Sequence, residues 1–170
     1  MAVKLKDETI LNQWSMLVDG AASRGSEVLD DIRSGLKAAK IPGNCDWELE
    51  EVESGGFMSK TRREFLIVRL EQFSDYRIYI GVRSYGAYLD CCRFLTVEPG
   101  FFKRQISQAI APGADTLLSG PKNLLNEQDL HAWVTVVHHV VLDAVKKLMS
   151  KAGQDPAGLR RETKGFLQVW

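Results

Sequence analysis

The sequence predicts an α+β fold in a single domain, with a central four-stranded antiparallel sheet flanked by an N-terminal helical pair and by C-terminal helices. Apolar stripes with helical spacing occupy the first forty residues, alternating patterns occupy the middle, and a long valine-rich stripe lies toward the end. Helices, then consecutive strands, then helices are typical of the α+β class. A chain of 170 residues fits one domain, so we expect residues 1–170 to fold together.

The first forty residues contain two apolar stripes. They consist of Ile10, Trp14, Leu17 and Val18, and of Val28, Leu29, Ile32 and Leu36. Intervals of three and four residues place each stripe on one side of a helix. The glycine-containing stretch 20–25 separates them. The sequence therefore predicts a helical pair over residues 7–40, either as a hairpin or as one kinked helix.

Residues 46–97 change to the alternating pattern of β-strands. The candidate strands are 46–53, 65–70, 76–82 and 89–97. The segment 65–70 is almost wholly apolar, which is typical of a strand buried on both faces. Because the connections are short, neighbouring strands must run antiparallel. We therefore expect a four-stranded antiparallel meander.

Residues 99–150 are predicted to return to helices. Apolar residues at helical spacing indicate a helix over 101–110, whereas two prolines and two glycines indicate a loop over 111–126. The segment 127–150 predicts one long helix. Its valines lower the intrinsic helix propensity, so we expect packing against the sheet to stabilise it.

The last twelve residues, 159–170, are basic and end in the apolar run Phe166 to Trp170. Chain termini are usually loose unless another element holds them. An alternating run of this kind can add as an edge strand to a sheet. We therefore predict a terminal docking segment that packs on its own domain, on a second copy or on another protein, with a disordered tail as the remaining alternative.

The composition is that of an ordinary globular protein, with 45% hydrophobic and 26% charged residues. Its 22 Lys and Arg balance 22 Asp and Glu, which disfavours a dedicated nucleic-acid binder with a strong positive field. The adjacent Cys91 and Cys92 should point to opposite faces of a strand, so they cannot share one bridge or one metal ion. We expect a cytoplasmic protein without a signal peptide, and without a membrane span because polar residues interrupt the apolar stretch 134–145.

Three histidines, His131, His138 and His139, lie on the predicted long helix. His131 and His138 share a face but are about 10 Å apart along the axis, too far for one metal ion. His139 has only Asp143 on its side, which leaves a metal site short of ligands. We therefore predict no metal site, no cofactor and no catalytic residue, and we interpret the histidines as residues beside the core.

A basic and aromatic sheet face is the main candidate binding surface. It consists of Arg69, Arg77, Tyr79, Arg83 and Tyr85, which alternation places on one side of their strands. Tyr and Arg are enriched at the energetic centres of protein interfaces. Aromatic rings with arginines also stack single-stranded bases. The first interpretation, ahead of a protein interface and of nucleic-acid binding, is a solvated face whose charge is neutralised by the glutamates of the first predicted strand.

These observations favour a non-catalytic protein-interaction or assembly protein that binds a protein partner or associates with itself. The alternative is a small-ligand-binding protein or an enzyme that uses a sheet–helix cleft, with His138 or His139 as acid or base. Weak single-stranded nucleic-acid binding through the basic and aromatic face ranks third. No membrane partner is expected.

Overall fold

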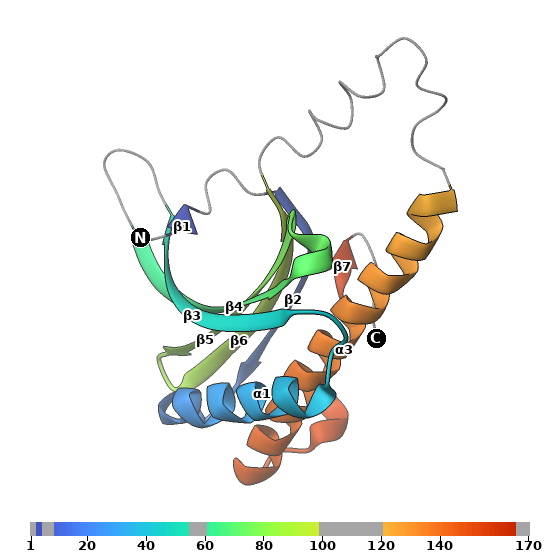
Figure 1. Cartoon of the computed structure of the whole chain (residues 1–170). Helices are drawn as coiled ribbons and strands as arrows, with labels where there is room; N and C mark the ends of the chain where they lie inside the picture. Colours follow the sequence, from blue (N-terminus) through green and yellow to red (C-terminus); the bar gives the residue numbers. More distant parts are fainter. Residues whose placement is uncertain (1–2, 5–8, 55–60, 99–120, 166–170) are drawn as a thin grey trace.

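A computed structural model describes residues 3–4, 9–54, 61–98 and 121–165 (Figure 1). This part of the chain contains two α-helices and a seven-stranded sheet. The helices are α1 (Gly25–Ala39) and α3 (Pro121–Lys151). The strands are β1 (Val3–Lys4), β2 (Thr9–Val18), β3 (Cys45–Ser54), β4 (Thr61–Leu70), β5 (Tyr76–Tyr85), β6 (Tyr88–Val97) and β7 (Lys164–Gly165). Short 3-10 helices occupy Ala22–Arg24, Glu71–Phe73 and Pro156–Gly158.

The sheet confirms the α+β class and the antiparallel meander, but it is larger than predicted. Strands β3, β4, β5 and β6 pair antiparallel in chain order. Strand β2 pairs antiparallel with β6, β7 pairs antiparallel with β2, and β1 pairs parallel with β3. The order is β1-β3-β4-β5-β6-β2-β7, so the described sheet has more than the four expected strands.

The prediction of a helical pair over residues 7–40 is wrong in its first half, because this part forms β2. The buried side chains of β2 are those of Asn12, Trp14 and Val18, and its exposed large apolar ones are those of Ile10 and Leu17. Burial along β2 follows the two-residue period of a strand. The hydropathy pattern does not show this period, because the buried Asn12 is polar and the exposed Ile10 and Leu17 are apolar and fall at helical spacing. An irregularity in the β2–β6 register next to Ile10 disturbs the alternation further.

Both helices pack on one face of the sheet, where a single apolar core joins them to the strands (Figure 1). Helix α1 buries Val28, Ile32 and Leu36, at the spacing that its sequence predicts. It approaches α3 so closely that a Cβ added to Gly35 would lie 2.7 Å from Cγ1 of Val140. The valine-rich helix is therefore stabilised by burial.

The opposite face of the sheet carries a smaller buried cluster of Val52, Phe65, Ile67 and Tyr79. Strand β4 is thus buried on both faces, as its apolar run predicts. Room for the Phe65 ring comes from Gly81 on β5, since an added Cβ would lie 2.7 Å from Cε1 of Phe65. The adjacent cysteines lie on opposite faces, as expected, because Cys91 belongs to the helix-side core and Cys92 packs against this smaller cluster.

The long C-terminal helix is confirmed and begins earlier than predicted. Helix α3 starts at Pro121, inside the expected loop 111–126, where the fixed φ of proline suits a first helical turn. The predicted helix 101–110 and the loop residues 111–120 lie outside the described residues, as does the apolar end 166–170. In the described ranges, no helix is long and apolar enough to cross a membrane.

Candidate functional site

The predicted binding face lies on one side of the sheet, but part of it is inaccessible. Strand register pairs Ile67 with Tyr79, and the other predicted residues follow at two-residue steps along β4 and β5. Tyr79 is completely buried and stands edge-on to Phe65, with ring centroids 6.0 Å apart. Its ring therefore packs into the smaller buried cluster on this face of the sheet and is not accessible to a partner.

Each arginine of this face has a carboxylate partner. The ion pairs are Arg69–Glu50, Arg77–Glu98 and Arg83–Asp90. Arg83 also places its guanidinium carbon 5.3 Å from the ring centroid of Tyr85, which is 60% exposed. Paired arginines attract a phosphate backbone less than free ones do, because their positive charge is already neutralised.

Exposed apolar side chains gather at one end of this face. Tyr85 and Tyr88 pair directly across the β5–β6 hairpin. Leu17 lies on the neighbouring strand β2, where it pairs with Asp90. All three apolar side chains are more than 40% exposed. This end of the sheet therefore presents accessible apolar and aromatic surface.

The three histidines of α3 do not converge on one site. His131 and His139 are exposed, whereas His138 is completely buried. The pKa of His138 falls from 6.5 to about 4, mainly because of burial and also because of the positive charge of Arg93. Its imidazole is therefore neutral at pH 7. Over the stretches that the structure describes, no group of three or more His, Cys, Asp or Glu could hold a metal ion.

The adjacent cysteines are not activated nucleophiles. Burial raises the pKa of Cys91 to about 12 and that of Cys92 to about 11. The thiolate is the reactive form of cysteine, and both groups are protonated thiols at neutral pH. Their positions are those of small core residues.

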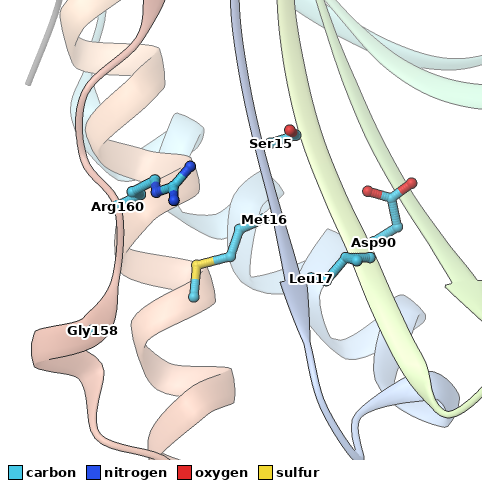
Figure 2. Close-up of a pocket in the computed structure, with 6 residues that line it drawn as sticks. All are labelled: Ser15, Met16, Leu17, Asp90, Gly158 and Arg160. Atoms are coloured by element: carbon cyan, nitrogen blue, oxygen red, sulfur yellow. The ribbon is translucent and has the colours of Figure 1, made fainter.

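A groove lies beside the outer edge of β2 (Figure 2). Strand β6 covers the inner edge of β2 from Thr9 to Val18, but β7 covers the outer edge only at Asn12 and Gln13. The groove has a volume of about 310 Å³ and is lined by Ser15, Met16, Leu17, Asp90, Gly158 and Arg160. Within the described chain, no strand pairs with the outer edge of β2 from residue 14 to residue 18.

The far wall of the groove is the chain that follows α3. Gln154 donates from Nε2 to the carbonyl oxygen of Asp19 at 2.8 Å, just beyond the end of β2. The chain then runs back along β2, with the 3-10 turn Pro156–Gly158 capped by the side chain of Asp155. We call residues 158–165 the C-terminal strap. The strap and β2 are about as far apart in sequence as the chain allows, so no local pattern reveals the groove.

Three side chains hold the strap on the body of the protein. Trp14 donates from Nε1 to the carbonyl oxygen of Arg160, and His138 donates from Nε2 to that of Arg161, each at 2.6 Å. Asn12 donates from Nδ2 to Oγ1 of Thr163 at 2.9 Å. Because a carbonyl only accepts, the neutral His138 ring carries its proton on Nε2.

Arg93 on β6 is a completely buried cation that Asn12 connects to the strap. Its Nη2 donates to Oδ1 of Asn12, while Nε and Nη1 have no hydrogen-bond partner among the described residues. Burial lowers the pKa of Arg93 to about 10, so it remains charged at neutral pH. A buried guanidinium with unsatisfied donors favours a nearby anion. The sequence did not identify Arg93 or Asn12 as site residues, because Arg93 interrupts the apolar alternation of its strand and Asn12 lies in a segment that was predicted to be helical.

Comparisons with protein-family models, with curated proteins and with solved structures find no match to this chain.

Proposed function

We propose that this protein is an interaction domain that binds an extended segment of a partner protein along the outer edge of β2. The observation that carries the proposal is the open edge from residue 14 to residue 18, which runs beside the groove. An unpaired strand edge presents backbone N–H and C=O groups in a row, and an added strand satisfies them. The side chains that line the groove would select among partner sequences.

The surroundings of the edge support this proposal. Leu17 lines the groove and belongs to the exposed apolar group with Tyr85 and Tyr88. Tyrosines beside a paired arginine are typical of the energetic centres of interfaces. Met16 and the carboxylate of Asp90 also line the groove (Figure 2). A partner strand would therefore meet backbone, apolar and charged groups together.

The alternative functions have less support. An acid–base role for His138 requires access to substrate, yet this ring is buried and occupied by a backbone carbonyl. Binding of single-stranded nucleic acid requires free cations, yet Arg69, Arg77 and Arg83 form ion pairs. A small apolar ligand in the groove is the closest competitor, because 310 Å³ is near the lower limit of ligand pockets.

Self-association is one form of the proposed activity, since two copies can join through their β2 edges. We also propose the cytoplasm as the location. The three free cysteines, Cys45, Cys91 and Cys92, support a reducing compartment.

The test is a selection of random twelve-residue peptides displayed on phage against the full-length protein. We expect selected peptides that bind in an extended conformation and that lose binding to a Ser15→Trp variant, whose indole fills the groove. The matched control is Val136→Trp at an exposed position of α3, which should keep full binding. Light scattering of both variants reports whether a self-associated form depends on the same edge.

Two results would contradict the proposal. One is the selection of peptides that bind Ser15→Trp as tightly as the wild type, which places the binding surface elsewhere. The other is failure to select any peptide, together with salt-sensitive retention of a labelled single-stranded DNA oligonucleotide.

A further inference from the structure

We propose that the C-terminal strap is a displaceable occupant of the β2 edge at Asn12 and Gln13, next to the open stretch 14–18, and that the partner segment that replaces it carries an acidic side chain directed at Arg93. The proposal rests on the proposed function and adds the chemistry of the partner. It follows from the hydrogen bonds that hold the strap, from the buried guanidinium of Arg93 and from the positive charge of the strap itself.

The body of the protein holds the strap through its backbone and through two buried strap side chains, those of Leu159 and Thr163. Trp14 and His138 donate to the carbonyl oxygens of two consecutive residues, Arg160 and Arg161. These two hydrogen bonds require an extended chain in this position but do not depend on the identity of its side chains. A partner segment with a different sequence can accept the same two bonds, so this arrangement suits the exchange of one strand for another.

Leu159 of the strap packs into the apolar core, and one polar side chain of the strap, that of Thr163, accepts a hydrogen bond from the body. The amide of Asn12 bridges two groups, since Nδ2 donates to Oγ1 of Thr163 and Oδ1 accepts from Nη2 of Arg93. Thr163 is buried, whereas its neighbours Glu162 and Lys164 are exposed. The residue at this position is therefore the polar one that a partner must match, and the amide of Asn12 connects it to the buried cation.

The strap is a poor electrostatic match for this site. It carries the cations Arg160, Arg161 and Lys164 against the single acid Glu162, and it presents a neutral hydroxyl to Asn12. A carboxylate in place of that hydroxyl would accept from Asn12 and neutralise Arg93, whose Nε and Nη1 have no described partner. Hydrogen bonds to charged groups are stronger than neutral ones, and more so where water is excluded. Charge complementarity thus selects an acidic partner segment over the strap.

The strap is attached to β2 over a short length. Its ladder consists of the pairs Asn12–Gly165 and Gln13–Lys164. Gly165 has φ +111, and a Cβ added there would lie 2.2 Å from the carbonyl oxygen of Leu11. A Gly165→Ala substitution therefore releases this end of the strap through local sterics, without changing any side chain of the binding edge.

The experiment compares two fluorescent eight-residue peptides based on residues 158–165. Both have the three cations replaced by serine, and they carry either glutamate or glutamine at the position of Thr163. Fluorescence anisotropy measures their binding to the full-length Gly165→Ala variant. We expect the glutamate peptide to bind at least about tenfold more tightly than the glutamine peptide, since a tenfold ratio corresponds to one added charged hydrogen bond of about 1.4 kcal/mol. Adding Arg93→Met should remove this preference.

A reversible lock tests displacement independently of Gly165. Gln13 and Lys164 are directly paired, so a Gln13→Cys and Lys164→Cys double variant can form a cross-strand disulfide. The oxidised protein should lose binding of the glutamate peptide, and reduction should restore it. The reduced form, in which the strap can leave the edge, also serves as the reference if Gly165→Ala lowers the melting temperature too far for binding measurements.

The outcomes separate this inference from the proposed function. If both peptides bind equally and Arg93→Met has no effect, the acidic preference is refuted while strand addition at β2 stands. If the oxidised and reduced double variants bind equally, the strap does not compete and its displacement is refuted. If neither peptide binds either variant, this inference fails, and the phage selection against wild type and Ser15→Trp decides the proposed function separately.

Discussion

The indole of Trp14 and the imidazole of His138 meet edge to face, with ring centroids 5.8 Å apart and planes at 74°. One ring comes from β2 and the other from α3, and together they donate to consecutive carbonyls of the C-terminal strap. This contact joins the sheet, the long helix and the strap at one point. The stability of the fold and the accessibility of the β2 edge are therefore coupled.

A Trp14→Phe substitution should loosen the strap. It removes the donor to the Arg160 carbonyl and part of a buried ring, which together should lower the free energy of unfolding by about 1–3 kcal/mol. Amide hydrogen exchange over residues 158–165 should accelerate. The matched control is Trp47→Phe on β3, where a half-buried indole is changed and strap exchange should keep its wild-type rate. Equal acceleration in both variants would mean that Trp14 does not hold the strap.

Acid should destabilise the protein through His138. The folded pKa of about 4 lies below the ordinary value of 6.5, so the unfolded chain binds more protons between these values. Stability should fall as the pH decreases from about 6.5 to 4, by at most about 3 kcal/mol from this group. Urea unfolding at a series of pH values measures the slope.

A His138→Phe variant should lose this part of the pH dependence, although it is less stable overall. The exposed His131 on the same helix is the control, and His131→Gln should retain the wild-type slope. A slope unchanged in His138→Phe would show that the acid sensitivity arises elsewhere.

Substitutions at Thr163 test the electrostatics beside Arg93 within the chain itself. We expect Thr163→Glu to be more stable than Thr163→Gln by about 1–2 kcal/mol, because the two side chains have nearly the same shape and only the first supplies a charge. Thermal unfolding at pH 7 measures the difference. Equal stability of the two variants would mean that no anion is favoured at this position.

Gly81 should not tolerate a larger residue. A Cβ there would lie 2.7 Å from Sγ of Cys92 and 2.7 Å from Cε1 of Phe65. Gly81→Val should therefore destabilise the protein by about 1–3 kcal/mol, as overpacked cores do. The control is Gly25→Ala, where the nearest atom is 3.5 Å away and the change should have little effect. A Gly81→Val protein as stable as the wild type would contradict the packing of this face.

The parts of the fold that were predictable from sequence are those with clean periodicity. The alternation of β3 to β6 and the valine stripe of α3 directly reflect one-sided or two-sided burial. Strand β2 was missed because Asn12 faces the interior and Leu17 faces solvent, which reverses the expected pattern at both positions. Asn12 is one of the residues that hold the strap, and Leu17 is one of those that line the groove.

The candidate site was not predictable from local patterns. Its walls, β2 and the strap, meet only through tertiary contacts such as that between Trp14 and Arg160. Alternation correctly placed the residues of the predicted binding face on one side of their strands, but no sequence pattern reveals that Tyr79 is buried. The site is indicated instead by buried polar residues such as Arg93. Removing such a group from water costs free energy, so its presence in the core points to a functional role.

The most direct test of strand addition at β2 is amide hydrogen exchange of residues 14–18 in the full-length protein, with and without a saturating amount of a peptide from the phage selection. The outward-facing amides of this edge should exchange at least about tenfold more slowly in the complex, as newly paired strand amides do, while α1 should be unaffected. Peptide binding that leaves the exchange of residues 14–18 unchanged would contradict the account.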